Sequence, residues 1–591
     1  MSASVLGVDR SILGQAWRWR GTDSQFGTEP DAGFRPDDLV TQLLLARGCP
    51  RDAVETHRLP TIRGFMPDPS IFRDMDRAAE RLADAVCNRE AVAIFGDYDV
   101  DGATSAALMV RLLRALGLTP AAYIPDRITE GYGPTTAALL RLGQGGASLI
   151  LTVDCGAQSY EPLAAAHAAG IDVVVVDHHK CASELPIAYA VVNPNRLDED
   201  AGAAFGHLAA VGVAFLLAAA LLRTLRSRNF FETHPEPKLI DLLDLVALGT
   251  VADVAALKGL NRAFVTQGLK IMGARRNVGL SALVDVSRLS RAPTCTDLGF
   301  ALGPRINAGG RVGKSDLGVR LLTTDDADEA EALAIELDRL NGDRRLIETA
   351  VNEAAEIALR TASDQSVAIV SGKTWHPGVI GIVAGRLKEQ LGRPVIVIAI
   401  DEDGLGKGSG RSISGVDLGA AVLAAKDAGL LIAGGGHAMA AGLSIDADRI
   451  PALGEFLHER LAAVVERSRQ DRAILFDAVI APGGLTPDLV SSLDEAGPYG
   501  MGWPAPRIAA GPVRVIRADT VGNGHVRAVV AGADGRSVKT VAFRHAATPL
   551  GQALLAAGPD RRLWIAGRAK IDDWNGRMSA ELHLEDAAWA D

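Results

Sequence analysis

The sequence of 591 residues lacks the features that would place the protein in a membrane, outside the cell or around a zinc ion. Its longest strongly apolar stretch, residues 208–222, is shorter than the roughly 20 apolar residues that cross a bilayer. The first residues do not combine a basic segment with an apolar core, so we expect no secretory signal. The 5 cysteines are widely spaced and form no Cys-x-x-Cys pair, which argues against a disulfide framework or a zinc site. We therefore expect a cytoplasmic protein that makes no membrane contact.

Length and composition predict a soluble protein of several domains. The chain is too long for one hydrophobic core, and its 48% hydrophobic and 23% charged residues are ordinary for globular proteins. The net charge of −11 argues against a protein that simply coats nucleic acid. However, the window from Arg507 to Arg577 holds 12 Lys or Arg against 5 Asp or Glu. This local surplus fits either a solvated surface or a face that follows phosphates.

The order of apolar runs predicts two α/β lobes followed by a small β-barrel. β-Branched runs separated by helical patterns indicate a parallel sheet, and short strands between Gly and Asp turns near the end indicate an OB-like barrel. The predicted strands are residues 91–95, 149–153, 173–176, 367–370, 394–400, 513–518, 525–530, 538–543 and 562–568, with helices at 103–116 and 325–360. The predicted units are a helical lead-in (1–65), a catalytic lobe (66–324), a connecting helix (325–362), a substrate-binding lobe (363–467) and a nucleic-acid-binding barrel (468–591).

Acidic and imidazole side chains follow three of the predicted strands. Residues 96–102 read Gly-Asp-Tyr-Asp-Val-Asp-Gly, Asp154 follows the second strand, and residues 177–179 read Asp-His-His. Ligands of parallel sheets gather at the carboxyl ends of the strands. A lone aspartate is more often a helix cap or a turn residue, but a crowd of such groups is unfavourable unless a cation neutralises it. The ensemble therefore predicts a divalent-metal site.

The spacing of these residues suggests how they would share two ions. Asp99 and Asp101 alternate with Val100, so both carboxylates can face one ion, and Asp154 could bridge two. His178 can supply a nitrogen ligand, while Asp177 could orient an imidazole. Asp253 follows another apolar run. Two ions held roughly 3.5–4 Å apart can activate water and stabilise a phosphoryl transition state.

Seven stretches occur in a fixed order between about residues 90 and 442: 96–102, 152–156, 176–179, 247–253, 303–307, 375–381 and 434–438. This ordered set resembles the DHH phosphoesterase superfamily and, within it, the RecJ family of single-strand-specific 5′→3′ DNA exonucleases. The β-rich end of the chain extends the resemblance to nearly the whole sequence.

The resemblance implies a set of metal ligands and catalytic residues. The ligands would be Asp99, Asp101, Asp154, His178 and Asp253, and the cofactor would be two Mn²⁺ or Mg²⁺ ions. Asp97 would be a ligand or a carboxylate just outside the ligand set, with the second role favoured. His179 would contact the scissile phosphate. We accordingly predict Asp97, Asp177 and His179 as catalytic residues.

A second set of residues is predicted to contact the nucleic acid. Ser409 and Arg411 lie in what we expect to be a glycine-rich turn, where amides and a guanidinium can hold a phosphate. The resemblance implies that this phosphate is the 5′-terminal one. Tyr132 offers a base-stacking face, although a half-buried core ring is the alternative. Arg305, Asn307 and Arg311 could contact phosphate or brace a loop. The full predicted set is Arg127, Tyr132, Arg305, Asn307, Arg311, His376, Ser409, Arg411 and His437.

Three further segments need separate treatment. Residues 308–315 fit a relaxed Walker A pattern, but residues 303–307 before them are predicted as a polar loop, and a P-loop follows a buried strand. ATP binding is therefore not expected. Residues 157–158 and 497–506 depart from the family pattern. Neither departure is expected to touch the metal set, while the second concerns how the barrel meets DNA.

The predicted function is a 5′→3′ exonuclease that releases 5′-mononucleotides from single-stranded DNA by two-metal hydrolysis, in recombination and repair. A cleft between the lobes would admit one strand with little sequence preference. The expected partners are a helicase and a single-strand-binding protein, and the expected state is a monomer. One alternative is a family member that cleaves short oligoribonucleotides or cyclic dinucleotides, although such enzymes typically lack the barrel. Another is a non-catalytic replication scaffold, against which the intact ligand set argues.

Overall fold

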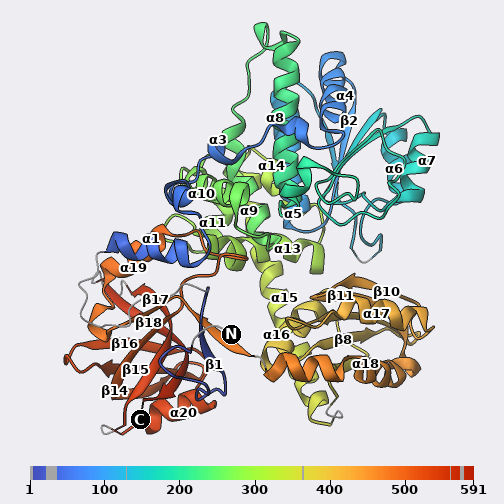
Figure 1. The fold of residues 1–591 in the computed structure, drawn as a ribbon. Helices are drawn as coiled ribbons and strands as arrows, with labels where there is room; N and C mark the ends of the chain where they lie inside the picture. Colours follow the sequence, from blue (N-terminus) through green and yellow to red (C-terminus); the bar gives the residue numbers. More distant parts are fainter. Residues whose placement is uncertain are drawn as a thin grey trace.

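The computed structural model describes residues 4–21, 36–127, 129–361, 365–470, 472–558, 561–572 and 578–590. Over these residues the chain forms two α/β lobes joined by the long helix α15 (Ala327–Thr361), with a β-barrel beside them (Figure 1). The predicted fold class is thereby confirmed. The predicted boundary between residues 362 and 363 lies outside the described residues.

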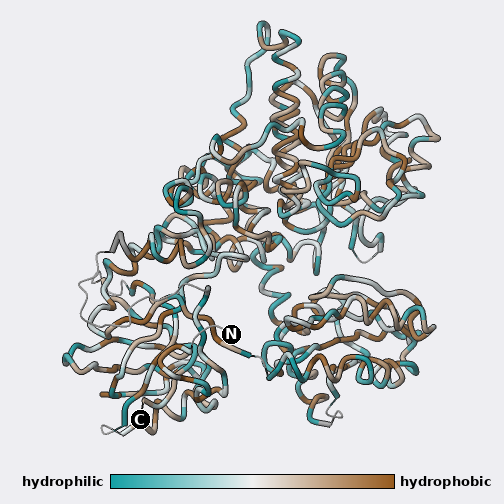
Figure 2. Tube along the Cα trace, viewed as in Figure 1, coloured by the Kyte–Doolittle hydropathy of each residue, from teal (hydrophilic) through white to brown (hydrophobic). Residues whose placement is uncertain are grey.

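The first lobe is built on a parallel sheet whose strands lie in the order β3-β2-β4-β5-β6. Alternate side chains enter two cores: Ile94 faces the layer of α4, α5 and α8, whereas Phe95 faces α6 and α7. Apolar side chains of these helices pack on both faces of the sheet, which explains why its strands show continuous apolar runs and hydrophobic colour in Figure 2. The strands are β2 (Val92–Gly96), β3 (Ala121–Tyr123), β4 (Leu149–Val153), β5 (Asp172–Val176) and β6 (Ala190–Val192).

Helices cover this sheet and extend the lobe away from it. They are α4 (Met75–Asn88), α5 (Val100–Ala115), α6 (Thr136–Gln144), α7 (Tyr160–Ala168), α8 (Ala210–Ser227), α9 (Leu243–Ala252), α10 (Gly259–Gly273), α11 (Val278–Val286), α12 (Cys295–Asp297), α13 (Gly303–Val312) and α14 (Leu317–Thr323). Helix α8 is long and apolar enough to cross a membrane, but 72% of it is buried inside the protein. It packs against α4, α5 and α9, as a core helix does.

The prediction of a polar loop at residues 303–307 is wrong, because these residues form the first half of α13. Pro304 follows directly on the π-helical turn Leu298–Leu302, so it lies within a helical run that is continuous from Cys295 to Val312. The Walker-like residues that follow continue the same helix to Val312. No strand–loop–helix arrangement exists in this described segment, which agrees with the expectation that ATP does not bind here.

The second lobe has the sheet order β10-β11-β9-β8-β7. The prediction of a glycine-rich turn at Ser409 and Arg411 is wrong, since both residues lie on the central strand β9. The elements are β7 (Ala368–Gly372), β8 (Val395–Ile400), β9 (Leu405–Arg411), β10 (Ala433–His437), β11 (Ala440–Asp446), α16 (Ile380–Leu391), α17 (Leu418–Asp427) and α18 (Ile450–Gln470).

The C-terminal module is a closed five-stranded barrel, because β14 pairs with both β15 and β17. Helix α20 lies between the third and fourth barrel strands, as in an OB fold. The basic surplus of the window is partly neutralised at the surface: Arg507 and Arg568 both pair with Glu585, and Lys539 pairs with Asp572. The elements are β12 (Ala473–Phe476), β13 (Ala478–Ile480), α19 (Pro487–Glu495), β14 (Ile508–Val521), β15 (His525–Ala531), β16 (Ser537–Ala542), α20 (Pro549–Ala556), β17 (Leu563–Asp572) and β18 (Ser579–Trp589).

The lead-in at residues 1–65 is only partly helical. Helices α1 (Pro36–Ala46), α2 (Val54–Arg58) and α3 (Ile62–Phe65) agree with the prediction, but β1 (Ala16–Trp19) is a strand. It pairs in parallel with β12, and the buried indole of Trp17 donates to Asp586 Oδ2 at 3.0 Å. The start of the chain is thus part of the C-terminal module, a pairing across more than 450 residues that local sequence patterns do not encode.

Candidate metal centre and phosphate site

The turn between β2 and α5 brings three carboxylates to the carboxyl edge of the first sheet. Asp99 caps α5: its Oδ1 accepts hydrogen bonds from the amides of Asp101 at 2.9 Å and Gly102 at 3.1 Å. Gly102 permits this close turn, since a Cβ there would lie 2.4 Å from the carbonyl oxygen of Asp97. Asp97 is buried, and its Oδ1 has no hydrogen-bond partner among the described residues.

Asp101 is held by the amino end of α8. Its Oδ2 accepts from the amide of Ala210 at 2.7 Å, and its Oδ1 accepts from the amide of Val211 at 3.0 Å. These amides carry the positive end of the helix dipole, which favours a carboxylate there. Sequence reasoning missed this contact. The only available signal was that the apolar run of α8 begins at Ala209 without a polar capping residue.

Asp154 leaves the end of β4 in a left-handed conformation, with φ of 61°. Its carboxylate is buried, and Oδ1 lies 3.3 Å from His178 Nε2 with no hydrogen-bond partner among the described residues. The hydroxyl of Tyr132 donates to the backbone carbonyl of Asp154 at 2.9 Å. A left-handed aspartate costs free energy, so this backbone is stabilised by its surroundings and aims the carboxylate at the histidines.

The two histidines after β5 have different environments. Nδ1 of His178 lies 3.1 Å from the carbonyl of Leu208, so it must donate, which leaves Nε2 with a free lone pair facing Asp101 and Asp154. Burial and the neighbouring His179 lower the pKa of His178 to about 4. A neutral imidazole with its nitrogen aimed at carboxylates is suited to bind a metal.

The surroundings of His179 favour its protonated form by contrast. Its Nδ1 lies 2.7 Å from Asp177 Oδ1 and 3.1 Å from the hydroxyl of Tyr132. Although burial opposes the effect, the hydrogen bond and charge of Asp177 raise the pKa of His179 to about 9. Burial alone would raise the pKa of Asp177. The hydrogen bond and charge of His179 and the charge of His178 outweigh burial and lower this pKa to about 2. The pair presents a fixed imidazolium, which is suited to contact a phosphate oxygen.

Two asparagines that sequence reasoning missed hold the backbone of this turn. The amide of Asn193 donates to the carbonyl of His179 at 2.8 Å, and that of Asn195 donates to the carbonyl of His178 at 2.5 Å. The departure at residues 157–158 contacts this turn as well, although neither contact reaches a predicted metal ligand. The Ala157 amide donates to Asp177 Oδ2 at 3.0 Å, and the Gln158 side chain donates to the carbonyl of Lys180. The contact of Ala157 with Asp177 uses the backbone amide, so it does not depend on which side chain stands at position 157.

Asp253 completes the cluster from the end of helix α9. Its Oδ2 lies 3.8 Å from His178 Nδ1. The turn that follows places Val254 at φ of 59°. The sequence predicted a carboxylate after an apolar run here, and that run forms helix α9.

These residues fit a two-metal centre. Their ligand atoms form three groups, each within 4.8 Å: Asp97–Asp99–Asp154, Asp101–His178–Asp253 and Asp154–His178–His179. Burial and then the neighbouring carboxylates raise the pKa of Asp101 to about 7 and that of Asp253 to about 9, and hold the pKa values of Asp97 and Asp154 well above their usual range. Such carboxylates and their unpartnered oxygens need a cation, and oxygen ligands with one imidazole suit Mn²⁺ or Mg²⁺.

Three half-buried arginines converge beside these carboxylates from both lobes. The guanidinium of Arg127 lies 4.9 Å from the ring centroid of Tyr98, next to Asp97. Arg311 Nη1 on α13 donates to the carbonyl of Gly378 in the second lobe at 2.9 Å. Burial, and then repulsion by Arg127, lower the pKa of Arg311 to about 10 and also lower that of Arg411. Cations that are partly desolvated and repel one another form a ready anion site.

The amino end of α16 adds to this anion site. Gly381 on α16 is so close to Ser409 and Arg411 that a Cβ there would lie 2.9 Å from Ser409 Oγ and 3.0 Å from a guanidinium nitrogen of Arg411. Arg411 Nη1 also donates to Ser409 Oγ at 3.1 Å. A hydroxyl, a guanidinium and a helix amino end together can hold a phosphate.

The other predicted contacts are less clearly placed. Arg305 pairs with Asp338 on α15 at 2.8 Å and donates to the carbonyl of Ala301, so it braces the helices. His376 Nδ1 accepts from the amide of Gly378 at 3.0 Å, close to the carbonyl that Arg311 contacts. Asn307 is half-buried on α13, and His437 is exposed at the end of the edge strand β10. Their roles, like those of the whole predicted set, stay predictions.

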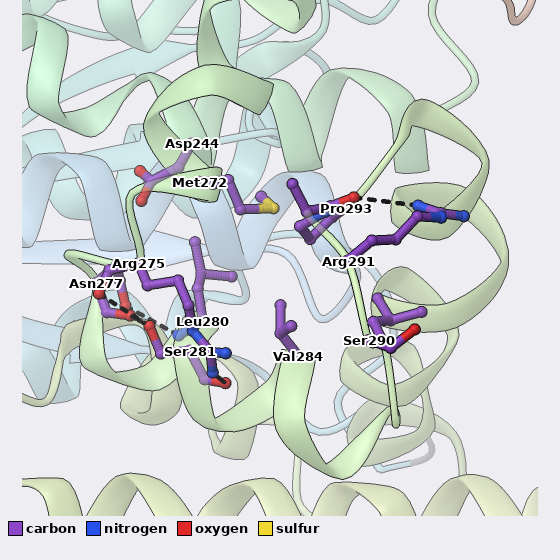
Figure 3. Close-up of a pocket in the computed structure, with 13 residues that line it drawn as sticks. Asp244, Met272, Arg275, Asn277, Leu280, Ser281, Val284, Ser290, Arg291 and Pro293 are labelled. Atoms are coloured by element: carbon purple, nitrogen blue, oxygen red, sulfur yellow. Dashed lines mark hydrogen bonds between the residues drawn. The ribbon is translucent and has the colours of Figure 1, made fainter. Parts of the chain in front are cut away.

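A separate pocket of about 230 Å³ lies between α9, α10 and α11 (Figure 3). Asp244 and Arg291 stand at its two ends in this view. None of the predicted site residues lines it. Asp244 is 2% exposed, and burial raises its pKa to about 6.

This burial predicts that Asp244→Asn stabilises the protein at high pH. The folded state holds the proton of Asp244 more tightly than the unfolded state does, so stability falls as pH rises from about 4 to about 6. Asparagine has the same shape without the charge, so the variant avoids the cost of burying an ionised carboxylate. This cost amounts to about 2–3 kcal/mol above pH 7. Thermal unfolding should show a higher midpoint for the variant at pH 8 and a smaller gain at pH 5. The surface variant Asp241→Asn should show no such gain, and an equal gain at both pH values would contradict the cause.

Comparison with known proteins finds the same arrangement of domains. Residues 91–250 match the DHH family, N-terminal domain; residues 364–463 match the DHHA1 domain; and residues 476–586 match the RecJ OB domain. The chain is 37% identical over 562 residues to the single-stranded-DNA-specific exonuclease RecJ of Dickeya dadantii, which covers 93% of this chain and 95% of that protein.

Two solved structures of RecJ from Thermus thermophilus are also similar. RecJ in complex with Mn²⁺ superposes with a TM-score of 0.75 at 31% identity, covering 93% of this chain and 75% of that one. RecJ in complex with Mg²⁺ gives a TM-score of 0.67 at 29% identity, covering 94% and 77%. Both ions named there are the ones that the ligand set of this chain suits.

Proposed function

Because the chain belongs to the RecJ family of single-stranded-DNA-specific exonucleases, we propose that it degrades single-stranded DNA from the 5′ end and releases 5′-mononucleotides. The observation that carries this proposal is the position of the arginines. Arg127, Arg311 and Arg411 form an anion site directly beside a cluster of aspartates and histidines. A phosphate held by the three arginines brings the neighbouring phosphodiester to the aspartates and histidines.

We assign Asp99, Asp101, Asp154, His178 and Asp253 as ligands of two Mn²⁺ or Mg²⁺ ions, and Asp97 as the carboxylate that backs them. When bound, such ions lower the pKa of water and stabilise the charge of the phosphoryl transition state. The protein contributes geometry: the α8 amides fix Asp101, and the carbonyl of Leu208 fixes the tautomer of His178. Ligands positioned in advance cost no reorganisation when the substrate reacts.

His179 and Asp177 act on the scissile phosphate in this scheme. The imidazolium of His179 donates through Nε2 to a non-bridging oxygen, while Asp177 holds Nδ1 and keeps the ring charged. Tyr132 is 53% exposed although its hydroxyl is bonded to the backbone of Asp154, so its ring face is free to stack on the terminal base.

Ser409, Arg411 and the amino end of α16 hold the 5′-terminal phosphate, with Arg127 and Arg311 on the facing lobe. We also assign His376, Asn307 and His437 to contacts with the single strand. Because the lobes meet where Arg311 bonds to Gly378, we infer that one strand passes between them and that duplex is excluded. The barrel binds the single strand beyond the site.

We further propose that the protein acts as a monomer in the cytoplasm, in DNA recombination and repair. An enzyme restricted to single strands depends on a helicase to open duplex. It also meets DNA covered by a single-strand-binding protein. These partners follow from the substrate.

Digestion of a long single strand labelled at either end tests the proposal. With Mn²⁺ or Mg²⁺, the 5′ label should appear first as mononucleotide, and the 3′ label should remain on long products until late. Chelator should abolish cleavage, because it removes the cations that the clustered carboxylates would hold. Matched duplex should be resistant.

Other outcomes point to other functions. Activity confined to oligomers of a few nucleotides would favour a short-substrate phosphoesterase, and early release of the 3′ label would reverse the polarity. Binding without cleavage would indicate a scaffold. The intact ligand geometry argues against that last outcome.

A further inference from the structure

The linker loop, residues 497–503, packs directly on the turn that follows Asp253. The amide of Leu257 donates to the carbonyl of Met501 at 2.9 Å. A Cβ on Gly500 would lie 2.7 Å from Leu257 Cδ1, and one on Gly502 would lie 3.2 Å from Ala256 Cβ. The two glycines therefore allow an approach that larger residues would block.

The turn that the linker loop contacts is itself strained. Helix α9 ends with the amide of Val254 bonded to the carbonyl of Val251 and the amide of Ala255 bonded to that of Thr250. This end motif needs a left-handed residue, which is usually glycine, but Val254 occupies the position at φ of 59°. A β-branched residue is disfavoured there, and Val254 is 57% exposed, so its own packing compensates little. We therefore expect the contacts of Leu257 with the linker loop to stabilise the conformation of this turn.

A buried arginine joins the linker loop to the same lobe. Arg262 on α10 is fully buried and donates to the carbonyls of Ala496, Gly497 and Pro498. The neighbouring Asn261, also fully buried, donates to the carbonyls of Ala256 and His207. His207 directly precedes Leu208, the residue that fixes His178. The turn after Asp253 thus lies between the linker loop and the segment His207–Leu208, whose second residue holds His178.

We propose that the linker loop of the C-terminal module positions Asp253, and that Gly500 and Gly502 are positioning residues for the metal group Asp101–His178–Asp253. The inference rests on the proposed metal centre. It runs against the expectation that the departure at residues 497–506 has no bearing on the metal set. The loop contributes no ligand and acts only through Leu257 and Ala256.

The effect should be confined to one of the two ions. Asp97, Asp99 and Asp154 come from the ends of β2 and β4, and within the described part of the chain neither end is hydrogen-bonded through its backbone to residues 497–503. Asp253 alone stands on the turn that the loop supports. Displacing that turn should therefore weaken one metal-binding event and spare the other.

Calorimetric titration of the full-length protein with Mn²⁺, without DNA and at constant pH, tests this. The wild type should show two binding events, and Asp253→Asn should lose one. Gly500→Ala should weaken that same event by about 10- to 100-fold, as loss of support around a metal ligand does, with the other event unchanged. Gly502→Ala is the second variant, should Gly500→Ala fail to fold.

Matched controls separate positioning from general damage. Gly484→Ala has open space for its methyl group, as does Gly524→Ala, which shares with Gly502 a positive φ (80° against 70°). Both should bind Mn²⁺ like the wild type. Unchanged binding in Gly500→Ala, or equal weakening of both events together with a lower melting temperature, would overturn the inference. If the wild type bound no Mn²⁺ at all, the proposed metal centre itself would fail.

Discussion

Asp101→Asn is expected to abolish cleavage of single-stranded DNA while leaving the protein folded and able to bind its substrate. Both carboxylate oxygens of Asp101 accept amides at the start of α8, and the side chain also faces His178 Nε2. The amide variant keeps the shape and one acceptor oxygen, but its NH2 group cannot accept the second α8 amide, and it loses the charge that a divalent ion needs. We expect kcat/KM to fall on the order of 10³-fold or more, since electrostatic stabilisation of the transition state is lost.

The matched control for this change is Asp172→Asn on the same sheet. Asp172 stands at the amino end of β5, away from the cluster, and pairs with Arg81 at 2.7 Å. Losing a partly exposed ion pair costs about 1 kcal/mol or less and should leave activity intact. DNA binding by all three proteins, measured with chelator present, should be similar. Retained cleavage in Asp101→Asn would remove this residue from the catalytic centre.

The parts of the site that local patterns encode were predictable. The strands β2, β4 and β5 are continuous apolar runs because both sheet faces are covered, and each is followed by acidic or imidazole residues. Once these strands are taken as parallel neighbours, their carboxyl ends must meet at one edge. Asp99, Asp154 and His178 therefore follow from the sequence alone.

Glycine and proline caused two of the errors of local structure. In β9, Gly406, Gly408 and Gly410 do not make a turn: a Cβ at each would lie 2.8 Å or less from Ile398, Leu443 or Leu418. These glycines make room for neighbouring side chains in a strand. Pro304 was taken as part of a loop, whereas it lies in a helix. Only the surrounding structure reveals whether such a glycine lies in a turn or a strand, and whether such a proline lies in a loop or a helix.

Contacts across long sequence separations account for the rest. Asp101 is fixed by amides more than 100 residues away, and β1 joins a strand at the far end of the chain. Arg311 meets the second lobe through the carbonyl of Gly378. No periodicity or local spacing specifies such partners. The arginine cluster is therefore visible only in the folded protein, although each arginine could be proposed from its motif.

The second large effect is expected for Arg411→Met, which should remove the preference for a 5′-phosphorylated end that the proposed phosphate site implies. The guanidinium of Arg411 stands beside Ser409, and burial and then repulsion by Arg127 lower its pKa. A terminal phosphate supplies a neutralising anion. Methionine retains the apolar stem but not the charge. For substrates with a 5′-phosphate, we expect kcat/KM to fall about 30-fold, equivalent to about 2 kcal/mol for a charge-assisted hydrogen bond.

A substrate with a 5′-hydroxyl end separates this effect from a general loss of activity. It offers no terminal phosphate, so the wild type should cleave it slowly and Arg411→Met should cleave it at nearly the same rate. The variant should also melt no earlier than the wild type, because a half-buried guanidinium whose described partners are all uncharged costs stability. Arg449→Met provides the control, since Arg449 lies in the same lobe and bonds the carbonyl of Gly429 at an exposed site. It should retain the full preference for the phosphorylated end. An equal loss on both substrates would place Arg411 in the path of the strand instead of at its end, and the terminal phosphate would then have to be held by Arg127 and Arg311.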